Sequence, residues 1–329
     1  MTKLIINDCT TPSFNLALEE YLVKNFKEDN IIVLWRNDKS VIIGKNQNAY
    51  AEIDIDFVKE NNISVIRRLT GGGAVFHDLG NINYTFITDY KNGEIDSFSH
   101  FAQPVCAFLK ELGIDAAFSG RNDITVNSKK ISGTAKTVID GRTLCHGTLL
   151  FSADMSFLSK ALKPNNEKFR DKAVKSVESR VVNICSLLNE KMSVEEFLNR
   201  LSAFFVKEQK AEILPLSEND IYNVRKIEKE KYLKDEYNFG FSPTFEYKNV
   251  KKFPFGVVEC TMQVKEGRIE EIKFFGDFFS DKDIKEMEIA LKNTPIEKKS
   301  IEKVLKDVNA PDYINGSEID DILSLVLYI

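Results

Sequence analysis

Residues 67–81 of this 329-residue chain read RRLTGGGAVFHDLGN, and this stretch carries the strongest information on fold and function. Three adjacent glycines place backbone N–H groups on the outside of a tight loop, where no Cβ keeps a ligand away. Two arginines just before them supply planar donors that suit phosphate or carboxylate. The stretch indicates an anion-binding loop between two strands, although a tight hairpin with a bulge would use the same glycines.

The glycine spacing excludes two common nucleotide-binding motifs. A P-loop requires Gly-x-x-x-x-Gly-Lys followed by serine or threonine, and no such pattern occurs here. A dinucleotide-binding fingerprint is excluded because the position three after Gly73 is Phe76.

Short β-branched and aromatic runs on both sides of the loop predict the strands of one sheet. An amphipathic helix over 13–26, with Ser13 as its N-cap, precedes all of them, and a helix over 99–112, ended by Gly113, divides them. Because regular crossover helices do not separate the strands, we expect an α+β fold with a mixed sheet. The expected strands are 31–35, 41–43, 63–66, 74–76, 83–88, 124–126 and 148–151.

The sequence beyond residue 154 becomes more helical and more charged. Ser193-Val-Glu-Glu196 predicts a capping box for a helix that runs to about residue 208. A break marked by Gly240, Ser242 and Pro243 follows, and then a hairpin over 257–275 with two or three helices. We therefore expect a catalytic domain of residues 1–245 and a smaller α+β accessory domain of residues 246–329.

Charge and cysteine content exclude several classes of protein. The formal net charge of -5 and a pI near 5.5 argue against binding by neutralisation of phosphates, so we expect no nucleic-acid partner. Five cysteines without a Cys-x-x-Cys pair fit reduced thiols in a cytoplasm better than a disulfide framework or a zinc site. Without a run of about 18 apolar residues or a signal-type leader, we expect no membrane association.

A second group of polar and small residues follows the glycine loop. It consists of Asn122-Asp123, then Lys130-Ile-Ser-Gly133, then Cys145-His-Gly-Thr148. A lysine held beside small residues brings a fixed positive charge to an acyl-phosphate, and a nearby aspartate orients that lysine or a metal ion. Taken alone, Lys130 is more often a solvated surface charge and His146 a structural histidine.

Together these blocks resemble the lipoate–protein ligase family. The family pattern is RRxxGGGxVxHDxGN, then ND, then KxSGxA, then HGTLL, and all four blocks occur here in that order. The likeness extends to 12–17 with Glu19-Glu20, and to 35–37, 43–48 and 274–278, and it spans most of the chain. It implies a catalytic domain of the biotin/lipoate ligase type. It also implies an enzyme that activates lipoic acid with ATP as lipoyl-AMP and transfers the lipoyl group to a lysine of an acceptor protein.

The resemblance also implies a set of site residues. Lys130 is expected to be catalytic, in contact with the lipoyl carboxyl and the α-phosphate, and Asp123 to lie near the phosphates or Mg²⁺. The residues expected around ATP are Arg68, Thr70, Gly73, Ala74, Val75, Phe76, Asp123 and Lys130. Those expected around lipoate are Lys130, Gly72, Gly73, His77 and His146, with Asn81 supporting the loop. The implied acceptors are lipoyl domains of 2-oxoacid dehydrogenase complexes and the glycine-cleavage carrier protein.

Two positions depart from the family pattern and keep a rival function open. Thr70 stands where serine is common and keeps its hydroxyl, whereas Cys145 stands where a second histidine is common. A cysteine nucleophile needs only a nearby base or cation, so a cysteine-dependent octanoyl- or lipoyl-transferase of the same fold is the alternative. Against it, transferases of the octanoyl type carry a cysteine directly after a proline, and here Pro164 is followed by Asn165.

Two further alternatives are weaker. A biotin ligase would carry a Gly-Arg-Gly-Arg loop, which this sequence lacks. A non-catalytic lipoate-binding protein would have no use for Lys130 together with Arg68 and Asp123.

Overall fold

The computed structural model describes residues 1–91, 97–154, 156–161, 180–239, 247–265 and 267–327. Residue contacts divide the chain into two compact units. The first unit comprises Met1–Ile42, Glu52–Arg67 and Val75–Asn238, and the second comprises Ile43–Ala51, Arg68–Ala74 and Phe239–Ile329.

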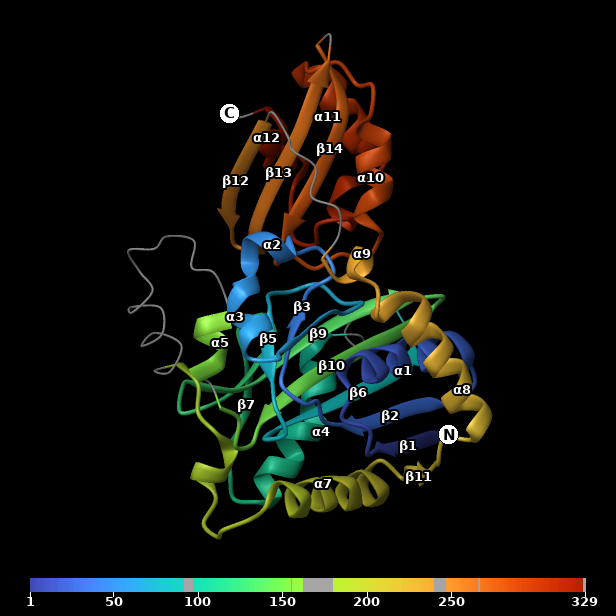
Figure 1. The fold of residues 1–329 in the computed structure, drawn as a ribbon, viewed down its shortest axis with the longest axis vertical. Coiled ribbons are helices and arrows are strands. Elements are labelled where there is room, and N and C mark those ends of the chain that lie inside the picture. Colours follow the sequence, from blue (N-terminus) through green and yellow to red (C-terminus); the bar gives the residue numbers. More distant parts are fainter. Residues whose placement is uncertain (92–96, 155, 162–179, 240–246, 266, 328–329) are drawn as a thin grey trace. The chain divides into compact units, whose positions relative to one another are not determined.

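An eight-stranded sheet forms the frame of the first unit (Figure 1). Strand β1 runs parallel to both of its neighbours, and the other neighbouring strands are antiparallel. The predicted α+β fold with a mixed sheet is therefore confirmed. The strands in spatial order are β11 (Glu212–Ile213), β1 (Thr2–Asn7), β2 (Asn30–Trp35), β6 (Asn81–Asp89), β10 (Arg142–Leu150), β9 (Lys129–Ile139), β8 (Asp123–Val126) and β7 (Ala117–Ser119).

Three of the predicted strands belong to a separate small sheet, so the prediction of a single sheet was wrong. Its order is β4 (Ser64–Arg67), β3 (Ser40–Ile43) and β5 (Val75–His77). Runs of three or four residues do not specify their partners, and here packing of Ile42, Ile66 and Val75 into the core beside the first helix sets the arrangement. Because β3 lies between β4 and β5, the glycine loop joins two strands that do not pair, and the hairpin interpretation is also wrong.

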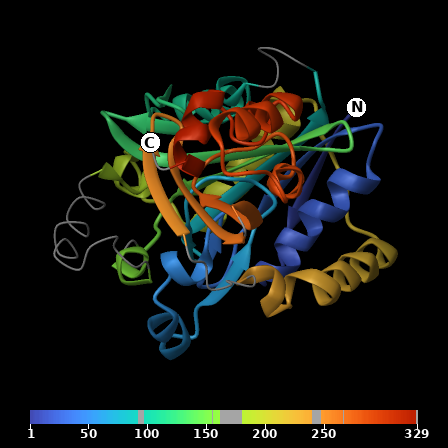
Figure 2. The same ribbon diagram turned by 90° about the horizontal axis from the view of Figure 1, so that it is seen from above.

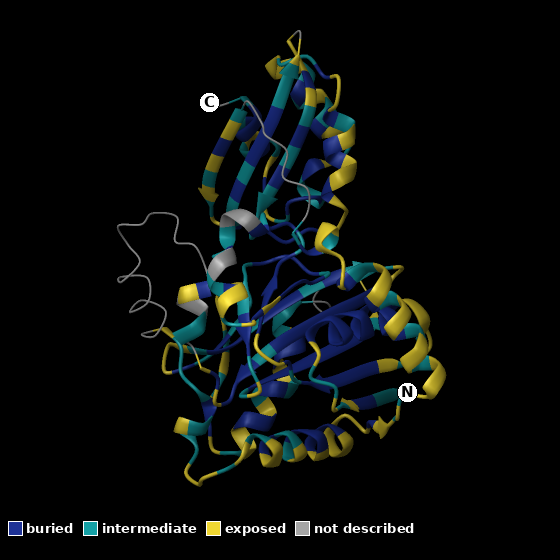
Figure 3. Cartoon of the chain, in the orientation of Figure 1, coloured by how far each residue is buried: buried dark blue, intermediate teal, exposed yellow. Residues whose placement is uncertain are grey.

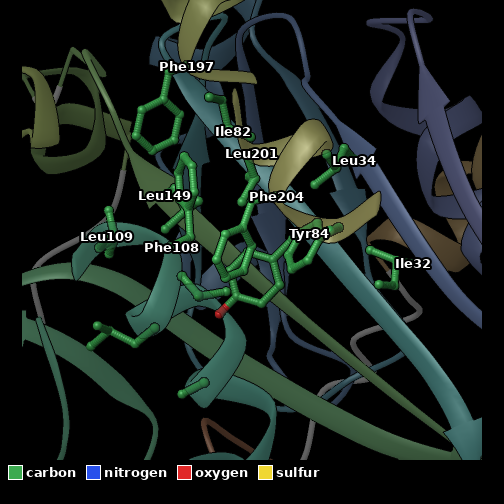
Figure 4. Packing of buried hydrophobic residues seen from close by; sticks show 14 of the residues in the cluster. Ile32, Leu34, Ile82, Tyr84, Phe108, Leu109, Leu149, Phe197, Leu201 and Phe204 are labelled. Carbon is green, nitrogen blue, oxygen red and sulfur yellow. The ribbon is translucent and has the colours of Figure 1, made fainter. Parts of the chain in front are cut away.

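Helices cover both faces of the large sheet (Figures 1 and 2). Helices α4 (Phe98–Glu111) and α7 (Val194–Glu208) pack on one face through a cluster that includes Phe108, Phe197 and Tyr84 (Figure 4). Helix α1 (Pro12–Asn25) lies on the other face, with α8 (Glu218–Ile227) beside it. Enclosed in this way, α1 is buried from Pro12 to Val23 and is not the half-exposed amphipathic helix that we expected (Figure 3).

Helix ends follow the predicted chemistry in part. Helix α1 begins at Pro12 with Thr11 as its N-cap, so the assignment of Ser13 as N-cap was wrong. Gly113, at φ +79°, follows the end of α4 as predicted. Ahead of α7, the Ser193 side chain accepts from the backbone N–H of Glu196, which is one half of the predicted capping box, while the Glu196 carboxylate accepts from Arg200.

The remaining described elements of the first unit are short. Helix α5 lies just after residue 154, where the sequence was predicted to become more helical. Residues 155 and 162 on either side of it are outside the described part of the chain, as are Pro164 and Asn165. The short elements are α2 (Ala49–Glu52, which crosses the unit boundary), α3 (Ile55–Glu60), α5 (Ser156–Ala161), the 3-10 helix η3 (Ile184–Leu187), the π-helix η4 (Glu228–Tyr232) and α9 (Asp235–Asn238).

The second unit has a core of its own, built on an antiparallel three-stranded sheet. The predicted hairpin is present, with Lys265 paired to Arg268, but sequence reasoning missed the strand before it. The predicted break at 240–243 lies outside the described residues. The elements are β12 (Tyr247–Phe253), β13 (Gly256–Lys265), β14 (Arg268–Gly276), α10 (Ile284–Leu291), α11 (Lys298–Asp307), η5 (Ala310–Asp312) and α12 (Ile319–Leu327).

None of the helices in the described residues is long and apolar enough to cross a membrane.

Candidate active site

Lys130 stands near the start of β9 with its ammonium against Asp123. The Nζ atom lies 2.8 Å from Asp123 Oδ1, and both side chains are about one third exposed, at 37% and 35%. The register of β8 and β9 sets Asp123 opposite Gly133, and a Cβ on Gly133 would lie only 2.9 Å from Lys130 Nζ. The glycine three residues after the lysine therefore leaves the space that the ammonium occupies.

This ion pair is a means of placement more than a source of stability. A pair as exposed as this one contributes about 0–1 kcal/mol to folding. It nevertheless fixes a compact cation on a strand, and the backbone of Lys130 is bonded on both sides, to Thr125 on β8 and through its carbonyl to the N–H of Val182. The result is a preorganised positive charge that a ligand can reach.

Two histidines of the predicted site are held by one face of α1. His146 Nδ1 lies 2.9 and 3.0 Å from the two carboxylate oxygens of Glu19. Asn15, four residues earlier and so on the same face of the helix, donates to Asn37 Oδ1, and Asn37 Nδ2 lies 3.1 Å from His77 Nδ1. An ionised Glu19 only accepts hydrogen bonds, so it places a proton on His146 Nδ1 and fixes the orientation of the ring.

Glu19 is also bonded to the sheet. Thr85 Oγ1 donates to Glu19 Oε1 over 2.6 Å and accepts from Trp35 Nε1 over 2.9 Å. The indole of Trp35 in turn packs edge-on to His77. These buried polar contacts connect the surroundings of both histidines, and hydrogen bonds in a buried site of low dielectric restrict the movement of the groups that they join.

Cys145 points away from these groups. Successive residues of a strand face opposite sides of the sheet, and Cys145 lies in the core cluster under α4 and α7, whereas His146 faces α1. Burial raises the pKa of the Cys145 thiol far above its usual range. A fully buried, protonated thiol is a poor nucleophile, which argues against the cysteine-dependent transferase.

The glycine loop, residues 68–74, belongs to the second unit. Arg68 is buried and folds its guanidinium over the loop, with Nε donating to Thr70 Oγ1 and Nη2 donating to the carbonyls of Gly71 and Gly73. These bonds span 2.7–3.0 Å. Gly72 has φ +92°, a left-handed conformation that favours glycine. Arg68 thus organises the loop in which it stands.

The loop sits on a turn of the second unit that follows β14. The N–H of Gly72 donates to Phe278 O, and a Cβ on Gly71 would collide with that same oxygen. Asn46, from the neighbouring segment, accepts from the N–H of Gly276 over 2.9 Å. Two of the three glycines are therefore required here, Gly71 by close backbone approach and Gly72 by its conformation.

The predicted site residues fall into two groups, one in each unit. Thr70 and Gly72–Ala74 lie with Arg68 in the second unit, and Val75–His77, Asp123, Lys130 and His146 lie in the first. Phe76 is buried on β5, where its ring stacks on Phe157 with centroids 5.5 Å apart. Sequence reasoning did not assign Glu19 or Asn15 to the site, although both fall in stretches that resemble the family and stand four residues apart in one helix.

The comparisons with known proteins agree along the whole chain. The model of the lipoyl protein ligase A/B catalytic domain matches residues 11–206, and the model of the bacterial lipoate protein ligase C-terminus matches residues 242–326. A Bacillus subtilis protein named lipoate-protein ligase LplJ is 41% identical over 98% of this chain and 97% of its own length. The chain belongs to the lipoate–protein ligase family.

Other members of this family support the assignment. Lipoate–protein ligase 1 of Staphylococcus aureus is 36% identical over 97% of this chain and 98% of its own length. The crystal structure of P. falciparum LipL1 in complex with lipoate superposes with a TM-score of 0.83 at 29% identity, covering 100% of both chains. The predicted family is confirmed, and with it an enzyme that attaches lipoyl groups to protein at the expense of ATP.

Proposed function

We propose that this ligase makes lipoyl-AMP at the Lys130–Asp123 pair and then passes the lipoyl group to an acceptor lysine. The observation that carries the assignment is the Lys130 ammonium, fixed between Asp123 and the space left by Gly133. A compact cation beside small residues suits a place where a carboxylate meets a phosphate, since neither reactant is excluded by bulk.

The chemistry proceeds in two balanced steps. In the first, a lipoate carboxylate oxygen attacks the α-phosphorus of ATP, the bond to the β-phosphate oxygen breaks, and pyrophosphate leaves. Lys130 offsets the negative charge that gathers on the phosphorus oxygens. In the second, the ε-amine of the acceptor attacks the acyl carbon, the bond to the phosphate oxygen breaks, AMP leaves, and the amine loses a proton as the amide forms.

Asp123 is the residue that we assign to Mg²⁺. In the described residues no group of three or more histidine, cysteine, aspartate or glutamate side chains is placed to hold a metal. Mg²⁺ bound with a nucleotide needs only one or two carboxylates, because phosphates and water supply its other ligands. The one-third exposed Asp123 carboxylate fits that requirement. Mg²⁺ would neutralise phosphate charge there.

The other predicted residues divide between the two ligands. Arg68, Thr70 and the residues from Gly73 to Phe76 would surround the adenylate, with Arg68 acting through the loop that it organises. Gly72, Gly73, His77 and His146 would surround lipoate. The structure of a lipoate-protein ligase A bound with ATP, 30% identical to this chain, supports ATP as the nucleotide.

We also propose the acceptors, the domains and the location. The acceptors are lipoyl domains of 2-oxoacid dehydrogenase complexes and the glycine-cleavage carrier protein, and the location is the cytoplasm, where the five unpaired cysteines remain reduced. Residues 1–245 would be the catalytic domain and 246–329 the accessory domain. The separate core of the second unit supports that division. A chain ending at residue 245 should then adenylate lipoate poorly, and undiminished adenylation would contradict an accessory role.

The deciding experiment is ATP–pyrophosphate exchange with lipoate, octanoate and biotin in parallel. We expect exchange with lipoate and none with biotin, followed by transfer to a lipoyl domain on mixing. The octanoate arm shows whether the shorter acyl chain competes. Absence of lipoate-dependent exchange, with transfer from a preformed acyl donor still present, would refute the adenylation mechanism.

A further inference from the structure

Arg67, the first arginine of the paired motif, is engaged by the protein itself. Its Nε donates to Tyr237 O over 3.0 Å, its Nη2 donates to Asn238 O over 2.8 Å, and its backbone N–H donates to Asn238 Oδ1 over 2.9 Å. The residue is only 8% exposed. Burial lowers the pKa of its guanidinium to about 10, which still leaves the group charged at neutral pH.

The segment that Arg67 binds is itself anchored to α1. Asn238 Nδ2 donates to Tyr232 O over 2.7 Å, and Tyr232, fully buried at the end of the π-helix η4, donates its hydroxyl to Glu20 over 2.8 Å. Lys231 adds an ion pair to the same carboxylate. Glu20 is the neighbour of Glu19, which holds His146. The contacts therefore run from Arg67 to the helix that orients the site histidine.

The location of this contact in the chain makes it relevant to the loop. Arg67 ends β4, and the glycine loop begins at the next residue. Asn238 is likewise the last residue of the first unit. Neither family model covers this partner segment, because their matches end at residue 206 and resume at residue 242.

We propose that Arg67 and Asn238 form a clamp that positions the base of the glycine loop, and that Arg67 does not bind the substrate anion. This inference rests on the proposed function, since the proposed function assigns the adenylate and lipoate as the ligands of the loop. Arg68 is the arginine of the loop itself, and Arg67 acts through Tyr237 and Asn238. The pair of arginines thus has two different tasks, one inside the loop and one at its point of attachment.

Loss of the clamp should act on binding more than on the chemical step. A loop whose base is released spends less time in the binding conformation, and apparent affinity falls in proportion to that fraction. If the competent fraction falls to about one tenth, the KM for lipoate rises about tenfold while kcat changes little. Loss of an arginine whose contact with the substrate anion strengthens in the transition state would instead lower the rate of adenylate formation at saturation.

The test compares four variants of the full chain in lipoate-dependent ATP–pyrophosphate exchange: Arg67→Gln, Asn238→Ala, the double variant, and Arg200→Gln as control. Arg200 is an exposed arginine of α7 with two surface ion pairs. We expect both single variants to raise the KM for lipoate about tenfold, the double variant to do no worse than the stronger single one, and the control to match the parent. A normal Asn238→Ala beside a low kcat for Arg67→Gln would overturn the clamp.

A second measurement separates the clamp from the proposed function. Amide hydrogen exchange at residues 68–74, without substrates, should be faster in Arg67→Gln and in Asn238→Ala than in the parent, whatever reaction the enzyme catalyses. If the parent shows no lipoate-dependent ATP–pyrophosphate exchange, the proposed function fails. The amide hydrogen-exchange rates at residues 68–74 still test the clamp in that case. Should Arg67→Gln not fold, Arg67→Lys, which keeps the charge and one donor group, should show an intermediate rate. Unchanged amide exchange in the folded variants would overturn the proposal.

Discussion

The ammonium of Lys130 and the carboxylate of Asp123 lie 2.8 Å apart, with Asp123 directly opposite Gly133 in the pairing of β8 and β9. Any side chain at position 133 would meet the ammonium. Charge and available space thus define the same position for Nζ, and the cation is in place before a ligand arrives.

Lys130→Ala should therefore reduce the rate of adenylate formation by about 10²- to 10³-fold, the usual cost of losing one preorganised group aimed at developing charge. Lys130→Arg should restore only part of it, because a planar guanidinium does not fit where a compact ammonium stands beside Gly133. Pyrophosphate release and lipoyl transfer, measured separately, report the two steps.

Lys129 provides the matched control. Its side chain is exposed, so Lys129→Ala should leave both steps nearly unchanged. Neither substitution removes apolar core, and both variants should fold. If Lys129→Ala lost pyrophosphate release and lipoyl transfer while Lys130→Ala kept both, the catalytic role would have been assigned to the wrong lysine.

The Lys130 arrangement was open to prediction because it is local. The lysine and its glycine stand three positions apart on one strand, and a motif of that length already contains the steric condition. The contact between Glu19 and His146 could not be predicted from the sequence, since 127 positions separate the two residues and only the packing of α1 on the sheet brings them together. The same limit applies to the small sheet, whose short strands find their partners through tertiary packing.

The position of Arg67 shows a different limit. Its residue type and its place beside three glycines both favoured an anion, and nothing near it in the sequence announces Tyr237 and Asn238 as partners. Those partners lie 170 and 171 positions away in the sequence. Residue chemistry predicted what the side chain is able to bind, and the fold decides what it does bind.

Cys145 should be dispensable for turnover. Its thiol is fully buried on the face of β10 opposite His146, and burial keeps its pKa high. We expect Cys145→Ala to retain most of the ligase activity, with a modest fall in the midpoint of thermal unfolding from the small cavity. Mass spectrometry of the parent during turnover should find no acyl group on this residue. An acyl-thioester at Cys145 would favour the cysteine-dependent transferase as the function of this site.

Glu19→Gln should weaken the hold on His146. The carboxylate accepts from both His146 and Thr85, whereas an amide offers one oxygen and two N–H groups, so a donor must face a donor unless a ring or hydroxyl turns. We expect a higher KM for lipoate and a stability loss of about 1–3 kcal/mol. Steady-state exchange kinetics and denaturant unfolding give the two numbers. Wild-type values of both would remove Glu19 from the site.

Glu20 gives a pH-dependent contribution to stability. Burial acts to raise the pKa of this carboxyl, but Lys231, Lys24 and the Tyr232 hydroxyl outweigh it, and the net pKa is lowered. A lowered pKa in the folded state means that the stabilisation is complete above the ordinary glutamate value, near 4.3, and is lost as the pH falls through the folded value.

The comparison of parent with Glu20→Gln isolates this effect from other carboxylates. At pH 7 the variant should be less stable by about 1–3 kcal/mol, since Lys231 loses a buried charged partner. Below about pH 4 the difference in stability between parent and variant should shrink, because the parent carboxylate becomes protonated and is then uncharged like the glutamine. Denaturant unfolding at the two pH values measures it, and a difference that stays constant with pH would contradict the assignment of Glu20 as the charged partner.

Gly71→Ala tests whether the glycine loop needs the turn on which it sits. A Cβ at position 71 would collide with Phe278 O and lie 2.9 Å from the Cα of Phe279, and backbone atoms cannot move aside as the end of a flexible side chain can. Gly73, two residues on, is the control within the same loop, because the nearest atom to its Cβ is Asp277 Cβ at an ordinary 4.0 Å. Gly71→Ala should therefore lower stability by about 1–3 kcal/mol, the usual cost of overpacking, while the stability of Gly73→Ala stays within about 0.5 kcal/mol of the parent.

The rate of adenylation distinguishes the two variants in a second way. Gly73→Ala places a methyl group where the adenylate is expected, so this variant should lose activity without losing stability. Calorimetry and pyrophosphate exchange on both variants give the answer, and equal stability of the two would show that the turn after β14 does not shape the loop.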